Sequence, residues 1–365
     1  MCIIYTPAFG QGRAKVVDDL VRANYPDKHG PGIAVLINRG DSVGQCVNSG
    51  LGNLKLQTPI SSESQFRMAS VSKQFTAYAI FQLIEQRKLS FATTLGDVFT
   101  DLPKAIQEIK VGQLLQHTSG IWDYESLMPA NQTNQLLDSD VLDIIKGKEE
   151  TYFTPGHTFR YSNTGYCLLS LIVEHMTGLA YPEYVEQFLF KPSGLDDARV
   201  FEPGRDIPNR VVGYHPDSGK YIFADQSLTS ATKGDGGVYI STQEFAKWID
   251  SCVADPVKNR SYLDSLVAQK VLVKDNVYYS MGWFLTWDDA GGICLFHSGE
   301  STGFHNIVYV VPDRKVKLMV FTNRDDQQIG AFFDELLTAE GITWNKSLVP
   351  SVYLFEWLSR VYASD

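Results

Sequence analysis

Three short groups of polar residues have the types and spacing that nucleophilic catalysis needs, and the first is Ser70-Val71-Ser72-Lys73. Its serine and lysine stand three positions apart, so they share one face of a helix. A serine hydroxyl is a weak nucleophile until a base takes its proton, and a lysine becomes such a base when burial lowers its pKa. A helix N-terminus also favours developing negative charge. The group therefore predicts a serine nucleophile with a lysine base.

The same Ser-x-x-Lys pattern recurs at Ser230–Lys233, so context has to choose between the copies. The second copy runs into Gly234-Asp235-Gly236-Gly237, which prevents a helix from starting there. Residues 70–86 instead carry apolar side chains nearly all round and contain no Pro or Gly. They predict a buried helix that opens at Ser70.

The second group is Tyr161-Ser162-Asn163, directly before a predicted helix over 164–177. Residues two apart in an extended loop point the same way, so both side chains could face one cleft. A tyrosine can transfer protons when cations lower its pKa, and an asparagine can bind a substrate amide. The alternative is a packed tyrosine followed by a helix-capping asparagine.

The third group is His297-Ser298-Gly299, at the end of a predicted strand over 293–296. A polar side chain followed by a small residue and glycine suits a strand edge that accepts a substrate backbone, because glycine permits close approach. Similar Lys-x-Gly triplets at 28–30 and 110–112 lie before other elements, so this pattern is weak by itself.

The elements that position these groups follow from the hydrophobic periodicity. Strands are predicted towards both ends of the chain, at 31–40, 43–50, 277–285, 293–296, 304–311 and 316–323. Helices are predicted at 12–24, 112–117, 138–146, 164–177, 181–189, from 242 and at 327–339. The expected class is α+β, with one antiparallel sheet flanked by helices and a mostly helical domain inserted between its two halves.

The predicted division is a discontinuous α/β domain (1–95 plus 226–345), an inserted helical domain (96–225) and a C-terminal tail (346–365). Within the tail, residues 348–362 have the pattern of an amphipathic helix. We expect it to pack on the body of the protein, with a partner or a membrane surface as the alternative.

Composition excludes several classes of protein. The chain has 365 residues, with 32 Lys and Arg against 42 Asp and Glu, a net charge of −10. This acidic balance, with no block of like charges, disfavours nucleic acid as a partner. A hydrophobic content of 44% with 12% aromatic residues excludes disorder. No run approaches about 18 apolar residues, so no membrane-spanning helix is expected.

The five cysteines are widely spaced and form no Cys-x-x-Cys pair or Cys/His cluster: Cys2, Cys46, Cys167, Cys252 and Cys294. They predict reduced thiols that pack, and no metal site. Residues 1–7 lack a basic segment and a long apolar stretch, so no signal peptide is predicted. The compartment stays open between the cytoplasm and, if a leader was removed, the periplasm or the extracellular space.

Taken in order, the three groups resemble the serine β-lactamase and penicillin-binding-protein superfamily. The sequence looks most like its class C β-lactamase-like branch, which includes D-Ala-D-Ala carboxypeptidases, D-aminopeptidases and esterases. The resemblance covers roughly residues 30–340. It also includes Phe66-Arg67-Met68-Ala69, Leu114–Gly120, Pro155-Gly156, Tyr161–Tyr166, Gly236-Gly237 and Ser241-Thr242.

The resemblance implies a role for each matching residue. Ser70 would be the acylated nucleophile and Lys73 its base partner. Tyr161 would carry a proton to the leaving group and later activate water. Asn163 would orient the substrate amide.

The third group has implied roles too. His297 stands where many relatives have lysine, which makes the charge there depend on pH near neutrality. With Lys73 it would form a cationic pocket, although the change disfavours an efficient β-lactamase. Gly299 would allow the substrate backbone to approach, and the backbone N–H groups of Ser70 and Glu300 would form the oxyanion hole.

The implied function is a cofactor-free serine hydrolase that forms an acyl-enzyme. Its substrate would be a small molecule or peptide: a β-lactam, a D-amino-acid peptide or a small ester. The alternative is a non-catalytic binding or assembly protein that keeps the motifs by inheritance. Side chains expected near the cleft are Trp122, Asp123, Tyr124, Phe304 and His305, while His117 is expected to be structural.

Overall fold

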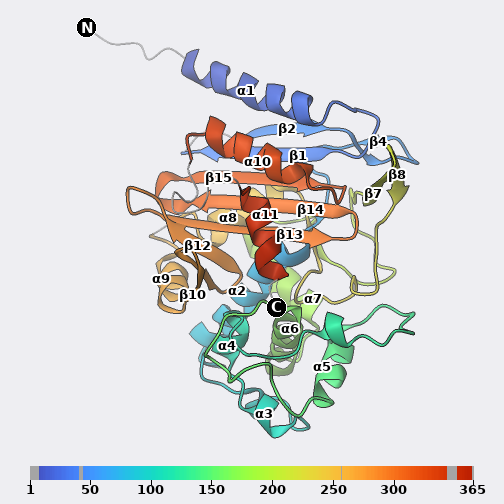
Figure 1. Ribbon diagram of the computed structural model, residues 1–365. Helices are drawn as coiled ribbons and strands as arrows, with labels where there is room; N and C mark the ends of the chain where they lie inside the picture. Colours follow the sequence, from blue (N-terminus) through green and yellow to red (C-terminus); the bar gives the residue numbers. More distant parts are fainter. Residues whose placement is uncertain (1–7, 41–43, 256, 343–351, 364–365) are drawn as a thin grey trace.

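The computed structural model describes residues 8–40, 44–255, 257–342 and 352–363, and its centre is an eight-stranded antiparallel sheet (Figure 1). The strand order is β10-β11-β12-β13-β14-β15-β1-β2. These strands are β10 (Val271–Lys274), β11 (Val277–Ser280), β12 (Trp283–Trp287), β13 (Ile293–Ser301), β14 (Phe304–Val311), β15 (Val316–Thr322), β1 (Ile33–Arg39) and β2 (Gln45–Ser49). The predicted α+β class, with one sheet built from both ends of the chain, is confirmed.

Side-chain alternation along β1 explains why the sheet is covered on both faces. Ile33, Val35 and Ile37 belong to one buried cluster, whereas Ala34 and Leu36 belong to another. Successive residues of a strand point to opposite faces, so a strand that is apolar throughout needs packing partners on each side.

Three helices cover the first face: α1 (Ala8–Asn24), α10 (Gln328–Ala339) and α11 (Leu354–Tyr362). Val17 and Val21 of α1 are buried there, as the predicted amphipathic pattern requires. In Figure 1, α11 runs from α10 across the sheet to the junction with the helical region below. The final predicted helix therefore packs on the body of its own chain; residues 348–351 of that prediction lie outside the described residues.

The second face is covered by η1 (Ala69–Ser72), α2 (Lys73–Glu85) and α8 (Thr242–Cys252). Helix α2 is buried along most of its length, and Phe75 stacks on Trp248 of α8 with ring centroids 4.5 Å apart. The predicted buried helix is confirmed, although its first turn, which contains Ser70, is a 3₁₀ turn.

The middle of the chain forms a mainly helical region below the sheet (Figure 1). Its helices are α3 (Lys104–Gln107), α4 (Val111–Leu115), α5 (Asp138–Lys146), α6 (Asn163–Thr177) and α7 (Tyr181–Val185), and short 3₁₀ and π turns lie between and after them. Short strands complete the chain: β3 (Leu51–Asn53), β4 (Thr58–Pro59), β5 (Phe66–Arg67), β6 (Arg199–Val200), β7 (Tyr214–Asp217), β8 (Lys220–Phe223) and β9 (Val238–Ile240). The domain boundaries stay predictions.

Several features differ from the predicted elements. The single strand expected over 277–285 is two strands, β11 and β12, which turn at Met281-Gly282. Gly282 has φ +82°, and a Cβ there would lie 2.8 Å from the backbone of Gln74, so glycine is needed for the turn to pack against α2. The second difference is that helices α3 and α9 (Arg260–Ala268) and strands β3 to β10 were not predicted. Strand β13 also continues through His297-Ser298-Gly299 instead of ending at residue 296.

Two expectations from composition agree with the structure. The four cysteines within the described ranges are unpaired thiols, and three of them are buried. Among the described residues, no helix has both the length and the apolar character needed to cross a membrane.

Close packing of β13 against η1 depends on Gly299. A Cβ at this position would collide with the carbonyl oxygen of Met68, two residues before Ser70. At Gly299, which has no side chain, β13 therefore lies directly against the segment that carries Ser70.

We predict that Gly299→Ala lowers the free energy of unfolding by about 1–3 kcal/mol, because the strand or the 68–70 segment has to shift. Chemical denaturation measures this change. Gly147→Ala is the matched control, since a Cβ there meets only the Ile144 carbonyl oxygen at 3.4 Å. Equal stability of the two variants would contradict the close packing.

Candidate active site

Ser70 and Lys73 meet at the junction between the sheet and the helical region. Lys73 Nζ donates hydrogen bonds to Ser70 Oγ (3.0 Å), Asn163 Oδ1 (2.7 Å) and the backbone oxygen of Asp235 (3.0 Å). The 3₁₀ turn followed by α2 brings the serine and lysine side chains together, as their spacing predicts. All three acceptors surround one amine, which fixes its position.

Burial sets the protonation of Lys73. Its side chain is 0% exposed. Desolvation lowers the pKa of Lys73 below 10.5, and the charges of Asp235, Asp123 and Glu125 act in the opposite direction. A lysine whose pKa is depressed in this way is a better proton acceptor near neutral pH than an exposed one.

The backbone before the serine is strained. Ala69 is buried and has φ +47°, a region that residues other than glycine rarely adopt. Such strain costs on the order of 1–3 kcal/mol and persists only where surrounding packing enforces it. Here β13 and Gly236 lie on either side of Ala69, and the strained residue turns Ser70 towards the cavity.

Asn163 connects the second sequence group to Lys73. It is the first residue of α6; its Oδ1 accepts from Lys73, and its Nδ2 donates to Glu125 Oε1 at 3.0 Å. Its backbone N–H donates to Asp123 Oδ2 at 2.7 Å. Both ends of the side chain are therefore engaged, so Asn163 does more than cap a helix.

Tyr161 lies beside the amine and is 9% exposed. Lys73 Nζ is 5.0 Å from its ring centroid, and its hydroxyl has no full hydrogen bond among the described residues. Burial and then Tyr362 raise the pKa of Tyr161 well above 10, while the Ser70 hydroxyl acts in the opposite direction. The condition named for a tyrosine base, a pKa lowered by cations, is therefore not met, and Tyr161 is a neutral phenol at neutral pH.

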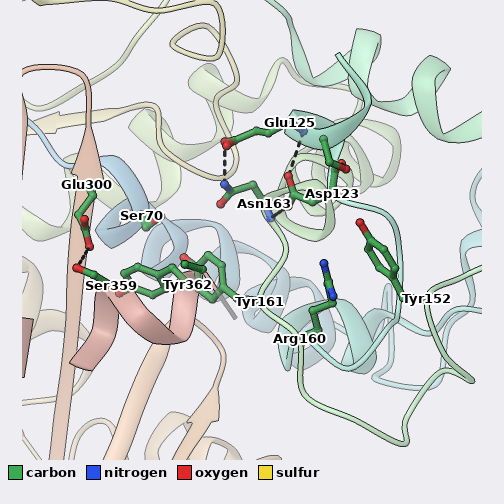
Figure 2. Close-up of a pocket in the computed structure, with 12 residues that line it drawn as sticks. Ser70, Asp123, Glu125, Tyr152, Arg160, Tyr161, Asn163, Glu300, Ser359 and Tyr362 are labelled. Carbon is green, nitrogen blue, oxygen red and sulfur yellow. Dashed lines mark hydrogen bonds between the residues drawn. The ribbon is translucent and has the colours of Figure 1, made fainter. Parts of the chain in front are cut away.

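A cavity of about 480 Å³ opens in front of Ser70 (Figure 2). Its lining residues are Ser70, Asp123, Glu125, Ser126, Tyr152, Arg160, Tyr161, Asn163, Glu300, Ser359, Tyr362 and Ala363. The structure thus brings the predicted Ser70, Tyr161, Asn163 and Glu300 to one cavity, with Lys73 buried behind them.

His297 does not line that cavity, and its side chain is 0% exposed. Its Nδ1 lies 2.6 Å from the Ser298 oxygen and 3.3 Å from the Tyr362 hydroxyl. Burial and then the Lys73 charge lower the pKa of His297 to about 3. The expected change of charge near neutral pH, and the cationic His297–Lys73 pocket, are therefore wrong.

Gly299 and Glu300 have separate positions on β13. Gly299 lies against the Met68 segment behind the serine, whereas the Glu300 side chain reaches the cavity and accepts a 2.6 Å hydrogen bond from Ser359 Oγ. Desolvation raises the pKa of Glu300. The oxyanion role of the Ser70 and Glu300 backbone N–H groups stays a prediction.

The C-terminal helix contributes a wall of the cavity that the sequence analysis did not anticipate. Tyr362 packs on Tyr161 with ring centroids 4.6 Å apart (Figure 2). The Tyr362 hydroxyl lies 2.8 Å from Ser298 Oγ. Ser359 and Ala363 line the same side. The amphipathic pattern located this helix, but no motif connected it to Ser70.

Loop residues on the opposite wall were only partly anticipated. Asp123 lies in the cavity as expected, but Glu125, Tyr152 and Arg160 were missed. The other side chains expected near the cleft do not line this cavity: Trp122, Tyr124, Phe304 and His305. The guanidinium of Arg160 stacks over the Tyr152 ring at 3.9 Å. Since these residues belong to loops with no repeating pattern, only their polarity next to the Tyr161 group could have marked them.

Two further expectations concern residues near the site. Ser230 and Lys233 lie in turns away from the cavity, as expected for the second Ser-x-x-Lys copy. His117 is structural as expected: its Nδ1 accepts from the Ser162 N–H at 3.1 Å, and its ring lies 4.2 Å from that of Tyr161.

A buried group behind Lys73 could hold a metal ion, which the sequence did not suggest. Single ligand atoms of Asp138, Cys167 and Asp235 lie within 4.8 Å of one another. Both Asp138 oxygens already accept backbone N–H groups, from Lys233 and Gly234. In the structure these contacts hold the loop whose Asp235 carbonyl accepts from Lys73.

We predict that Tyr362→Ala lowers the free energy of unfolding by about 1–3 kcal/mol, because it removes a partly buried ring that packs on Tyr161. Tyr362→Phe keeps the ring and loses only the hydroxyl contacts, so about 1 kcal/mol is expected. Chemical denaturation of both variants separates the two contributions. Tyr353→Ala, at the exposed start of α11, is the control, and a Tyr362→Ala loss no larger than its loss would contradict the packing.

Comparison with known proteins agrees with this geometry. The chain is 26% identical over 317 residues to penicillin-binding protein 4* of Bacillus subtilis (strain 168), covering 82% of this chain and 70% of that relative. Overall it spans 65–70% of the length of the first curated relatives that it matches.

Two solved structures share the fold. The penicillin-binding protein from Bacillus halodurans superposes with a TM-score of 0.77 at 26% identity, over 87% of this chain and 98% of the other. The D-amino acid amidase from Ochrobactrum anthropi SV3, complexed with L-phenylalanine amide, has a TM-score of 0.75 at 20% identity, covering 90% and 99% of the chains. The Beta-lactamase family model matches residues 15–339, so the chain belongs to the Beta-lactamase family, with penicillin-binding proteins and D-amino acid amidases as structural neighbours.

Proposed function

We propose that this protein hydrolyses an amide or ester bond through an acyl-enzyme formed on Ser70. The observation that carries the proposal is the hydrogen bond between Ser70 Oγ and the buried amine of Lys73, at the edge of an open cavity. Membership of the Beta-lactamase family supports serine hydrolase chemistry in general. Cavity size suits a small molecule or the end of a peptide.

The proposed reaction starts with neutral Lys73 taking the Ser70 proton while Oγ attacks the substrate carbonyl carbon. Tyr161 donates its hydroxyl proton to the leaving nitrogen or oxygen and regains a proton from the Lys73 ammonium. The bond to the leaving group breaks and an ester to Ser70 remains. Water then attacks the carbonyl carbon of this ester, and the water proton passes through Tyr161 and Lys73 to Ser70 Oγ. The bond to Ser70 breaks, and the product leaves as a carboxylic acid.

Amides of D-amino acids are the proposed substrate class. The support is the similarity to the D-amino acid amidase from Ochrobactrum anthropi SV3. Penicillin-binding relatives keep D-alanyl peptides and β-lactams as the alternatives to test. Neutral His297 disfavours the β-lactam alternative, because it supplies no cation for the carboxylate of that substrate.

We predict that a fluorophosphonate labels Ser70 and that Lys73→Met slows labelling by about 100-fold or more, as expected for loss of a general base. Mass spectrometry of the intact protein and its peptides measures the rate and the position of the adduct. Lys233→Met, in the second Ser-x-x-Lys copy, is the matched control. Absence of any adduct on Ser70 with several reagents would favour the non-catalytic alternative.

We also predict that the rate of Ser70 acylation rises with pH through the pKa of Lys73, because only the neutral amine accepts the proton. The Asp235 charge raises that pKa, so Asp235→Asn shifts the rising limb to lower pH. A pH profile of kcat/KM for an ester substrate measures the shift. A limb that stays in place, or moves to higher pH, would contradict the role of Lys73.

A further inference from the structure

The charge of the cavity wall points to one kind of substrate group. Among its lining residues, three are carboxylates, Asp123, Glu125 and Glu300, and one is a cation, Arg160. The Arg160 guanidinium is stacked over Tyr152. His297 is buried outside the cavity and Lys73 is enclosed by its three acceptors. Such a cavity attracts a cationic group and repels a carboxylate.

Glu125 stands at the end of a hydrogen-bonded row that begins at the serine. Ser70 Oγ, Lys73 Nζ, the Asn163 side chain and Glu125 Oε1 are linked by contacts of 3.0, 2.7 and 3.0 Å. The second Glu125 oxygen makes no hydrogen bond within the described part of the chain, and the residue is accessible from solvent. Figure 2 shows Glu125, Asn163 and Asp123 together among the residues that line the cavity with Ser70.

This row determines which polar group of the cavity faces the substrate nitrogen next to the carbonyl group. Because Asn163 is engaged at both ends, the polar group that continues into the cavity is a carboxylate rather than a carboxamide. A neutral acylated nitrogen offers one N–H, whereas an ammonium offers up to three N–H groups and a full charge. Hydrogen bonds between charged partners are the stronger ones.

Asp123 holds this arrangement in place. Its Oδ1 accepts from the Glu125 N–H at 3.1 Å, and its Oδ2 accepts from the Asn163 N–H at 2.7 Å. One carboxylate therefore fixes the backbone of both residues in the row. Its negative charge also disfavours an anionic substrate group at the same wall.

We propose that Glu125 binds the free α-ammonium group of the substrate, so that the enzyme selects amides of unacylated amino acids or peptides with a free amino terminus. The α-nitrogen is separated from the attacked carbonyl carbon by one atom, and Glu125 lines the same cavity as Ser70. N-acylated amides and substrates with a carboxylate beside the scissile bond are selected against. This inference rests on the proposed acyl-enzyme chemistry of Ser70.

The ionisation of Glu125 agrees with this use. Desolvation in the cleft, followed by the Asp123 and Asp235 charges, raises the pKa of Glu125 to about 7, while Asn163 and Lys73 act in the opposite direction. The carboxylate is therefore charged above about pH 7, and α-amino groups stay protonated below roughly pH 8. Preference for the free amine should therefore rise with pH as Glu125 ionises, and fall again as the substrate amine loses its proton.

The test compares each enantiomer of phenylalanine amide with its N-acetyl derivative on the wild type and on Glu125→Gln. Glutamine keeps an oxygen that can accept from Asn163 and removes only the charge. We expect the wild type to prefer the free amine by at least about 10-fold in kcat/KM. Glu125→Gln should lose most of this preference through the free amine, with the N-acetyl substrate changing by less than about threefold. Glu149→Gln, an exposed carboxylate outside the cavity, is the control.

If turnover is slow, protection of Ser70 from a fluorophosphonate by the same four compounds gives their relative binding. A wild type that binds the N-acetyl compounds as well as the free amines, or a Glu125→Gln variant that affects both equally, overturns the inference. In both cases labelled Ser70 leaves the acyl-enzyme proposal standing. Loss of labelling in the wild type would instead remove the proposed function.

Discussion

Burial of the Lys73 amine is the physical constraint on which the rest of the site depends. A charged ammonium away from water is unfavourable unless its partners compensate, and here all three hydrogen-bond acceptors are uncharged oxygens: a hydroxyl, a carboxamide and a backbone carbonyl. The nearest full charges act from a greater distance and only partly offset desolvation. In the proposed reaction, this lowered pKa lets the amine accept the proton of Ser70. The strained Ala69, the absence of a side chain at Gly299 and the loop at Asp235 all serve to keep this geometry.

The wall opposite the acidic loop is made by the C-terminal helix, which lies outside the matched family region of residues 15–339. Tyr362 fills the space between Tyr161 and the His297-Ser298 strand and hydrogen-bonds to the strand. Its ring stacks on the His297 ring and helps to bury it, which disfavours the charged form of this imidazole. The neutral His297 and the three carboxylates of the cavity have the same consequence, because both disfavour an anionic substrate group.

The local patterns predicted much of the fold because they depend on residues close in sequence. Short continuous apolar runs located β1, β14 and β15, and the spacing of Ser70 and Lys73 predicted that their side chains would meet. The turn at Gly282 was missed because its cause is a contact with α2, far away in the chain. The charge of His297 was wrong for a similar reason, since burial by Tyr362 and other rings decides it and no local pattern reveals that burial. Glu125 and Ser359 reach the site from a loop and a terminal helix, which only the tertiary structure brings to the serine.

The most direct test of this account is the pKa of Lys73 itself. Carbon-13 NMR of the side-chain Cε, with ¹³C-labelled lysine and the assignment made by comparison with Lys73→Arg, follows its protonation as the pH changes. The account predicts a titration midpoint below the ordinary lysine value of about 10.4. A midpoint at or above that value would mean that the amine stays charged, and would contradict its role as the base for Ser70.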